Sequence, residues 1–362
     1  MENSPYTLQE MLAQVGALAA DVRALAGPAA EQVEALLGAP GWAQASQVYL
    51  TGDGDSFHAA LAAELAFESL AGVTCEPLSA LRFLRYGASW ERPPALAPGS
   101  VVIGISASGR TERVVQALER AREHGALTVA LTATPHSALT RAAGQALVLT
   151  PAGAGRSPGI RTYQASLLGL ALLAIGLGRR RGRYPAAHAD LLHAEIRALA
   201  DAIEATAAAV KDPCAELAAR IAHTPVMIML GSGPGFGTAC FAAAKLVEAA
   251  GVLAVGQDLE EWEQVEALAY PRDMPTVVIA PPGRCHDRAH AVATAARSFG
   301  RRVIAVAEAG DQELAEAAEV VLPVCGRVRE EWSPLLFHVF AGYLACFVAG
   351  RLGRLPFATN RR

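Results

Sequence analysis

Apolar positions along the chain follow two spacings, and stretches of the two kinds alternate. Residues 101–105 form a short run rich in valine and isoleucine, which has the length and β-branching of a buried strand. From Val114 to Ala121 the apolar residues recur every three or four positions, which predicts a helix that ends near Gly125. A second strand-like run, 127–132, follows at once. This alternation is typical of parallel strands joined by helices.

The alternation occurs twice in the chain. Residues 48–57 and 227–236 each read as a strand followed by Gly-x-Gly and then by a helical pattern. At an offset of 179 residues the following identical residues coincide: Gly52 with Gly231, Gly54 with Gly233, Phe57 with Phe236, Ala60 with Ala239, Ala63 with Ala242, Gly72 with Gly251 and Val73 with Val252. Each half reads as four strands that alternate with three helices. We therefore predict an α/β fold with two tandem, doubly wound, flavodoxin-like parallel sheets, each covered on both faces.

The two halves also set the expected domain boundaries. We expect an N-terminal helical segment at 1–37, a first lobe at 38–182, a helical linker at 183–214, a second lobe at 215–354 and a tail at 355–362. The basic run 179–183 lies between the lobes and is interpreted as a solvated linker. Ligands of such sheets bind where the strands end, which directs attention to the loops that follow residues 52 and 105.

Three small hydroxyls follow the strand at 101–105. Ser106, Ser108 and Thr111 lie on a loop that opens a helix, where free N–H groups and the positive end of the helix dipole favour an anion, most often phosphate. The alternative is that these hydroxyls only cap the helix. One serine or threonine would be enough for a cap, so three of them favour anion binding.

Composition narrows the function classes. Of the 362 residues 52% are hydrophobic, and the formal net charge is −4, so the chain can bury a large core and has no broad basic field for nucleic acid. The six cysteines form no CxxC pair, which predicts free thiols in a reducing cytoplasm. His286 and His290 are four apart, but no Glu or Asp completes a ligand set with them. We expect no metal and no cofactor.

Two further classes of protein, membrane proteins and dinucleotide-binding proteins, are disfavoured. The longest apolar stretch, 165–178, is shorter than a bilayer span and suits a buried helix, and residues 1–27 do not resemble a signal peptide, so we expect no membrane association. A Gly-x-Gly after a strand is also part of a dinucleotide-binding fingerprint. However, Phe57 and Phe236 occupy the place of the third glycine, and no acidic residue ends a second strand at the usual distance.

Four stretches, in order, resemble motifs of the sugar isomerase (SIS) domain family. Residues 54–59 (GDSFHA) resemble G-T-S-x-x-A, and residues 106–111 (SASGRT) resemble S-x-S-G-x-T. Residues 244–248 (AKLVE) resemble A-L-K-x-x-E, and residues 261–264 (EWEQ) fall where the family has E-x-x-H-G-P. The likeness runs from about residue 40 to residue 350. It is closest to the double-SIS group, which includes the isomerase half of glucosamine-6-phosphate synthase, sugar-phosphate deglycases and phosphosugar isomerases.

The resemblance implies roles for particular residues. Ser106, Ala107, Ser108 and Thr111 would form the loop that holds the phosphate of a sugar phosphate. Gly54 and Ser56 would lie near the sugar or the phosphate. The second half has PPGRCH at the equivalent place and has lost the hydroxyls, which implies one phosphate site per chain.

Lys245 and Glu248 are three residues apart, so they project from one face of a helix and can pair. The surrounding helix is almost wholly apolar, so both charges are expected to be drawn into the protein, although an ordinary ion pair is the plainer interpretation. Moving a proton between C1 and C2 of a sugar needs a carboxylate base, with a cation to steady the oxyanion. The resemblance assigns Glu248 as that base and places Lys245 beside the substrate.

Several positions depart from the family pattern. Gln264 stands where the synthase-like pattern has the histidine of ring opening, and a glutamine cannot relay a proton near neutral pH. The tail 355–362 lacks the ending that carries the lysine for the open-chain sugar. The loop 153–162 also differs, although Arg156, Ser157 and Arg161 could bind anionic groups. No glutaminase segment precedes the first half, so we expect no glutamine hydrolysis by this chain.

Two hypotheses therefore stay open. The first is an isomerase, or a deglycase or deaminase, that acts on a phosphorylated keto- or amino sugar through an enediol or enamine. The second is a non-catalytic phosphosugar sensor that keeps the phosphate loop. No helix-turn-helix precedes residue 40, which disfavours a DNA-binding sensor. The apolar helices at 165–178 and 334–350 exceed what two lobes need for their cores, so we expect a homodimer; the resemblance also implies a site at a subunit boundary.

Overall fold

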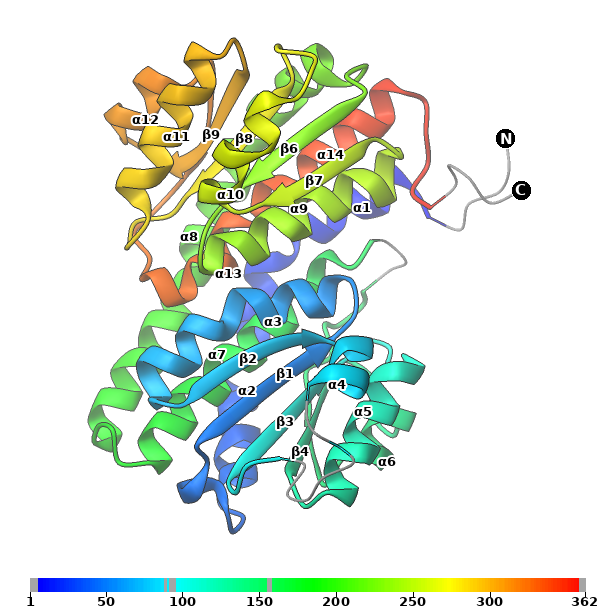
Figure 1. Cartoon of the computed structure of the whole chain (residues 1–362), viewed down its shortest axis with the longest axis vertical. Helices are drawn as coiled ribbons and strands as arrows, with labels where there is room; N and C mark the ends of the chain where they lie inside the picture. The colour runs from blue at the N-terminus through cyan, green and yellow to red at the C-terminus, as the bar shows by residue number, and fades with distance from the viewer. Residues whose placement is uncertain (1–5, 88–89, 91–95, 155–157, 358–362) are drawn as a thin grey trace. The chain divides into compact units, whose positions relative to one another are not determined.

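The computed structural model describes residues 6–87, 90, 96–154 and 158–357, and the chain divides into two compact units. We call residues 20–152 and 162–198 the first lobe, and residues up to 19, 153–161 and 199–362 the second lobe. Each lobe contains one five-stranded parallel sheet with helices on both faces (Figure 1). The predicted α/β fold with two tandem parallel-sheet lobes is confirmed.

The first lobe is built on a sheet of order β2-β1-β3-β4-β5. Its strands are β1 (Gln47–Gly52), β2 (Thr74–Ser79), β3 (Ser100–Ile105), β4 (Leu127–Thr132) and β5 (Gln145–Val148). β1 pairs with β2 on one side and with β3 on the other, both in parallel. The chain therefore changes direction across the sheet between β1 and β3, and such a switch point is where open α/β sheets bind ligands, at the carboxyl ends of the strands.

Helices cover both faces of this sheet. They are α2 (Leu18–Leu37), α3 (Asp55–Ala66), α4 (Ala80–Tyr86), α5 (Glu112–Glu123), α6 (Ala138–Ala142), α7 (Ile160–Arg180) and the start of α8 (Ala186–Ile221). α4, α5 and α6 line one side in Figure 1, where Val114 and Leu118 of α5 pack with Val102 and Ala130 of the sheet. On the other face α7 comes so close that a Cβ on Gly169 would lie 2.8 Å from Cδ1 of Leu131.

The second lobe repeats this plan with a sheet of order β10-β9-β8-β6-β7. Its strands are β6 (Val226–Leu230), β7 (Leu253–Gln257), β8 (Pro275–Ala280), β9 (Arg302–Glu308) and β10 (Val320–Val324). Its helices are α1 (Leu8–Gly16), most of α8, α9 (Pro234–Ala250), α10 (Leu259–Gln264), α11 (His286–Ser298), α12 (Gln312–Ala317), α13 (Ser333–Phe337) and α14 (Val339–Arg351). α10, α11 and α12 bury one apolar core against the sheet, while α9 and α14 pack together on the other face.

The backbone confirms the repeat that the sequence predicts. Gly54 and Gly233 each begin a helix, with φ/ψ of 56/−129° and 53/−128°. Gly72 and Gly251 each follow a helix in the left-handed region, at φ 62° and 60°. Because residues other than glycine rarely adopt such angles, the glycines that coincide at the offset of 179 mark turns that both lobes require.

The predicted number of strands was wrong by one in each lobe. The missed strands, β2 and β7, lie at sheet edges, where each pairs with one neighbour only. Glu76 and Pro77 interrupt the apolar pattern of β2, and Gly256 interrupts that of β7. An edge strand tolerates proline and polar residues because one side of its backbone needs no partner in the sheet, and this tolerance removes the signal that identified the central strands.

The two segments that were expected to link the lobes, 179–183 and 183–214, contain regular helix. α8 runs without a break through 36 residues, with Pro213 inside it. The basic run 179–183 is solvated at Arg180, Gly182 and Arg183, as the sequence predicts. It is also held in place, because α7 continues to Arg180, the Arg179 guanidinium pairs with Glu34, and Arg181 donates a 2.8 Å hydrogen bond to the carbonyl of Ala45. The N-terminal residues form two helices, α1 in the second lobe and α2 in the first.

Two segments are long and apolar enough to cross a bilayer by length and composition, Ile160–Arg180 and Glu330–Arg351. In their most apolar windows, 94% and 89% of the residues are buried inside the protein, as in core helices. The expectation of a buried helix at 165–178 is confirmed, although this helix is 21 residues long. The chain itself covers this apolar surface, so the surface no longer supports a dimer, and the expected homodimer stays a prediction.

Candidate functional site

The hydroxyl loop 106–111 connects β3 to α5. The buried Ser106 places its Oγ 2.8 Å from Oγ1 of Thr111, at the other end of the loop. Thr111 is the N-cap residue of α5, yet within the described chain its hydroxyl accepts no bond from the helix backbone. Ser108 is exposed, and its Oγ accepts a bond from the N–H of Arg110. The Thr111 hydroxyl therefore contacts Ser106 and does not cap α5, so capping does not account for this residue.

The carbonyl of Ala107 anchors the loop to the end of β4. It accepts hydrogen bonds from Oγ1 of Thr132 at 3.2 Å, from Oγ1 of Thr134 at 3.0 Å and from the N–H of Ala133 at 3.1 Å. Our sequence analysis missed both threonines. Their signal was two hydroxyls at the end of the strand next to β3. The anchor holds the Ala107 peptide rigidly, which leaves the loop N–H groups in one orientation.

Gly109 allows the loop to turn tightly over α6. Its φ is +61°, and a Cβ there would lie 2.2 Å from Oγ of Ser137 and 2.3 Å from its Cβ. The carbonyl of Gly109 accepts a bond from the N–H of Leu139. Only glycine satisfies both the backbone angle and the close approach.

The first turn of α3 follows the end of β1, the strand next to β3. Gly54 is the N-cap residue of α3, and Asp55 and Ser56 follow it. A Cβ on Gly52 would lie 2.8 Å from Cβ of Ser56 and 3.1 Å from the carbonyl oxygen of Ile105. The end of β1 therefore touches both the first turn of α3 and the last residue of β3. The structure thus brings all of the predicted first-lobe residues, Gly54, Ser56, Ser106, Ala107, Ser108 and Thr111, to the switch point between β1 and β3.

The predicted pair Lys245 and Glu248 is present on α9. Lys245 has no solvent exposure, while the Glu248 side chain is 28% exposed, and Nζ lies 2.5 Å from Oε2. The Lys245 ammonium also lies 5.0 Å from the ring centre of Phe241, which packs edge-on against the buried His338 at 5.5 Å. The expectation that both charges are drawn into the protein therefore holds fully for Lys245 and in part for Glu248.

The described part of the C-terminal tail lies along the same helix. The N–H of Phe357 donates a 2.8 Å bond to the carbonyl of Glu248, and the Phe357 ring meets that of Tyr6 at 4.9 Å. Residues 358–362 lie outside the described chain. Arg156 and Ser157 of the loop 153–162, which differs from the family pattern, also lie outside it. Arg161, the remaining residue of that set, is buried at the start of α7.

Gln264 is the last residue of α10, and its side chain is exposed. α10 packs against α11 and against the short turn Glu266–Leu268, which follows α10 in the chain. That turn and the loop after it, 266–272, are held by the buried Arg301, whose guanidinium donates to the carbonyls of Glu266, Ala267, Ala269, Pro271 and Arg272. The structure does not place Gln264 on α9 with Lys245 and Glu248, and its catalytic role stays a prediction.

The second lobe has a different set of groups where its strands end. His286 Nε2 lies 2.7 Å from Oδ2 of Asp311, beside a hollow of about 560 Å³ that Glu308 and Arg327 also line. Of these residues only His286 was considered from the sequence, as a possible metal ligand together with His290. In the part of the chain that is described, no group of three or more His, Cys, Asp or Glu side chains could hold a metal ion.

In the described chain, no cysteine whose thiol pKa is shifted is an activated nucleophile. Burial raises the pKa of Cys240, on the same helix as Lys245, to about 11. Burial, followed by the charge of Glu330, also raises the pKa of Cys285. A raised thiol pKa leaves little thiolate at neutral pH, so covalent thiol catalysis by these two residues is disfavoured.

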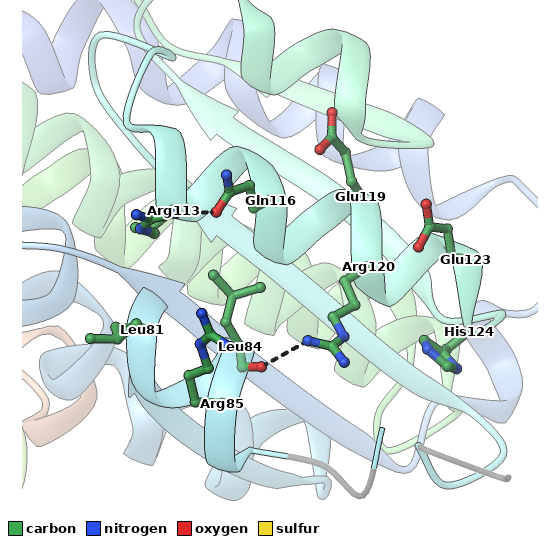
Figure 2. A pocket seen from close by; sticks show the side chains of 9 residues that line it. All are labelled: Leu81, Leu84, Arg85, Arg113, Gln116, Glu119, Arg120, Glu123 and His124. Atoms are coloured by element: carbon green, nitrogen blue, oxygen red, sulfur yellow. Dashed lines mark hydrogen bonds between the residues drawn. The ribbon is translucent and has the colours of Figure 1, made fainter. Parts of the chain in front are cut away.

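A groove of about 540 Å³ lies on the outer side of the first lobe, between α4 and α5. Figure 2 shows Arg120 reaching across it to the carbonyl of Leu84 and Arg113 turned toward Gln116. Arg85, Glu119 and Glu123 line the same groove and mix both signs of charge. None of the predicted site residues lines it, and it lies on the helix surface, not at the strand ends, so we do not include it in the site.

Residues 42–176, which hold the first sheet and the hydroxyl loop, match the family model of the SIS domain. The chain thus contains a SIS domain in its first lobe. It is 28% identical over 351 residues to a glutamine–fructose-6-phosphate aminotransferase of Gloeobacter violaceus, across 96% of this chain and 56% of that relative. The chain thus spans about half the length of the relatives it matches.

Solved structures show the same SIS fold over both lobes. The C-terminal domain of the Francisella tularensis glucosamine-fructose-6-phosphate aminotransferase aligns with a TM-score of 0.82, over 95% of this chain and 96% of that one, at 17% identity. A glucosamine-6-phosphate deaminase of Thermotoga maritima aligns with a TM-score of 0.68, over 96% of each chain, also at 17% identity. At these identities the likeness shows the fold alone, which is that of two tandem SIS lobes.

Proposed function

We propose that this SIS protein holds the phosphate of a sugar phosphate on the loop 106–111 and acts as an aldose–ketose isomerase, or as a deglycase or deaminase of an amino-sugar phosphate. The observation that carries the proposal is the Ser106–Thr111 contact of 2.8 Å, which fixes both ends of the loop without using Thr111 as a helix cap. Ser108 and the first N–H groups of α5 then remain for the phosphate oxygens.

Glu248 would be the base of this reaction. In the isomerisation its carboxylate takes the proton from C2 of the open-chain aldose, which forms an enediol, and then returns the proton to C1 to give the ketose. The Lys245 ammonium, 2.5 Å from Oε2, would stabilise the oxyanion that develops on the neighbouring oxygen. For an amino sugar the same proton transfer passes through an enamine; water then adds to the imine carbon, and ammonia leaves.

The relatives support this proposal by their names. The Gloeobacter violaceus relative is named an aminotransferase of fructose 6-phosphate, and the Thermotoga maritima structure is titled a glucosamine-6-phosphate deaminase. Both names describe chemistry at C1 or C2 of a phosphorylated hexose. The glutamine-dependent part of the first reaction is not included in the proposal.

A non-catalytic phosphosugar sensor is the second candidate. The exposed Gln264, which cannot relay a proton, favours it, as does the departure of the tail 355–362 from the family ending. A sensor would keep the phosphate loop and would make no use of Glu248. The two candidates therefore differ in whether a carbon-bound proton of the ligand exchanges with solvent.

The test is proton NMR in heavy water with hexose 6-phosphates and amino-hexose 6-phosphates. We expect deuterium to enter C1 or C2, the Glu248→Gln variant to lose this exchange while it still binds ligand, and Ser108→Ala to weaken binding. Glu313→Gln, which alters an exposed carboxylate of α12, is the matched control and should exchange like the parent. Ligand broadening without exchange would establish the sensor. If Ser108→Ala and Thr111→Ala both bound sugar phosphates like the parent, the loop assignment would be wrong.

A further inference from the structure

A hollow of about 560 Å³ lies at the carboxyl ends of three neighbouring strands of the second lobe, β8, β9 and β10. It is lined by the loop after β8, by residues 308–311 after β9, and by Val324, Gly326 and Arg327 at the end of β10. α11 and α12, which begin beside it, pack against each other (Figure 1). The volume is within the range of small-molecule sites, about 300–1,000 Å³. None of the residues that the proposed function uses lines this hollow.

The loop after β8 is held differently from its counterpart in the first lobe, the hydroxyl loop after β3. In the first lobe Gly109 packs on Ser137, the N-cap residue of α6, where a Cβ would lie 2.2 Å from Oγ. In the second lobe Gly283 packs on Glu330 instead, where a Cβ would lie 2.4 Å from Cδ, and the Glu330 carboxylate also accepts a bond from the next N–H of the loop. The loop is therefore fixed by Glu330, and the space beside Asp311, the N-cap residue of α12, stays open.

Two of the lining groups, His286 and Asp311, satisfy each other. Nε2 of His286 lies 2.7 Å from Oδ2 of Asp311, and Oδ1 of Asp311 accepts a 3.1 Å bond from the N–H of Leu314, in the first turn of α12. Because a carboxylate has only acceptors, Nε2 carries the hydrogen, and Nδ1 of the neutral ring is left as an acceptor. While the ring is neutral, the pair therefore supplies no free donor for an anion.

Glu308 and Arg327 are the charged groups of the hollow that have no partner among the described residues. Neither oxygen of the Glu308 carboxylate has a hydrogen bond or ion pair within the described chain, and its Oε1 is buried from solvent. The exposed Arg327 has no ion pair with any described residue either, so the two opposite charges line one hollow and do not meet across it. A buried carboxylate oxygen without a donor costs free energy, and a bound ligand with a positively charged donor would offset that cost.

We propose that this hollow binds a free amino acid, whose ammonium donates to the Glu308 carboxylate and whose carboxylate accepts from the Arg327 guanidinium. Such a zwitterion supplies both missing partners at once, through charge-assisted hydrogen bonds, which are the strong ones. The two carboxylates that line the hollow outnumber its one arginine, so a phosphate dianion is disfavoured there. This site goes beyond the proposed function and does not depend on it, because neither Glu308 nor Arg327 takes part in the proposed sugar-phosphate chemistry.

The test is isothermal titration of the full chain at about pH 7, where an α-amino group is largely protonated. The probes are the standard L-amino acids, one at a time, with glucose and inorganic phosphate as probes of the two other ligand chemistries. We expect at least one amino acid to bind the parent protein. Glu308→Gln should weaken that binding about tenfold or more, because it removes a hydrogen bond between charged groups, and Arg327→Gln should weaken it to a similar degree.

Two derivatives of the bound amino acid separate the two contacts. The N-acetyl derivative has no ammonium, so it should bind the parent protein weakly and should bind Glu308→Gln equally well. The carboxamide has no carboxylate, so it should not distinguish the parent protein from Arg327→Gln. The matched control is Glu313→Gln, which removes an exposed carboxylate of α12 that does not line the hollow and should bind the amino acid like the parent.

Absence of binding by every amino acid would overturn the proposal, as would binding that both variants keep or that Glu313→Gln loses to the same degree. Glucose binding that is lost in Glu308→Gln, or phosphate binding that is lost in Arg327→Gln, would assign the hollow to a polyol or an anion instead. Circular dichroism checks the fold of each variant, and the exposed Arg327 provides a test even if Glu308→Gln does not fold. Deuterium exchange into hexose phosphates should be the same in both variants as in the parent, so this proposal and the proposed function can fail separately.

Discussion

Gly109 is the position where the geometry of the hydroxyl loop can be tested most sharply. The change is Gly109→Ala, and the control is Gly125→Ala, at the other end of the same helix, α5. Both glycines have a positive φ, +61° at Gly109 and +82° at Gly125. They differ in their surroundings: a Cβ on Gly125 would have nothing within 4 Å, whereas one on Gly109 would lie 2.3 Å from Cβ of Ser137.

The magnitudes follow from these two facts. A left-handed φ costs an alanine about 1–2 kcal/mol, which both variants share. Crowding at a well-packed position costs a further 1–3 kcal/mol or so, and only Gly109→Ala incurs it. Rotation of the Ser137 side chain cannot relieve the contact, because Cβ of Ser137 is fixed to its backbone. We therefore expect Gly109→Ala to lower the free energy of unfolding by about 2–5 kcal/mol, and Gly125→Ala by about 1–2 kcal/mol.

The assay is urea unfolding of both variants, together with titration of each by a hexose 6-phosphate. Because the loop must shift to admit the new methyl group, Gly109→Ala should also lose about tenfold or more in affinity, and Gly125→Ala should bind like the parent. Equal destabilisation of the two variants, with parent-like binding by Gly109→Ala, would refute the reasoning. The loop would then hold phosphate without the tight approach to Ser137.

Two further predictions concern the rest of the molecule. Arg301→Lys should lower the free energy of unfolding by about 2–4 kcal/mol, because an ammonium cannot reach the five carbonyls that the guanidinium serves. Hydrogen exchange should then rise at residues 266–272 and not in the first lobe, and unchanged exchange there would contradict the clamp. Burial, followed by the charge of Arg197, lowers the pKa of His193, so the unfolded chain binds more protons than the folded one as the pH falls through about 6.5. Stability should therefore drop below that pH; melting temperatures at about pH 7.5 and 5.5 should show a smaller drop for His193→Gln, and an equal drop would exclude this cause.

Much of the fold and part of the site could be predicted from spacing and residue type. The central strands are runs such as 101–105, in which every side chain is buried, so their apolar signal is continuous. The repeat was visible because turns at Gly54 and Gly233 need backbone angles that glycine provides. The hydroxyl loop was visible for a similar reason, since a strand, three hydroxyls and a helix that follow one another form a local pattern; its anion-binding role stays a proposal.

Other features depend on contacts between residues far apart in the sequence. The edge strands β2 and β7 and the clamp of Arg301 on residues 266–272 have no local signal. The two threonines that anchor Ala107 follow a strand, but nothing near them in the sequence identifies Ala107 as their partner. Strand order decides which loops meet, and the order β2-β1-β3 placed the start of α3 and the hydroxyl loop 106–111 at the ends of neighbouring strands. The sequence by itself determined the central strands, the repeat and the position of three hydroxyls between a strand and a helix, because these depend on neighbours within a few residues. Only the tertiary structure decided which loops meet at the strand ends and how deeply each charge is buried. Both depend on how segments far apart in the chain pair and pack.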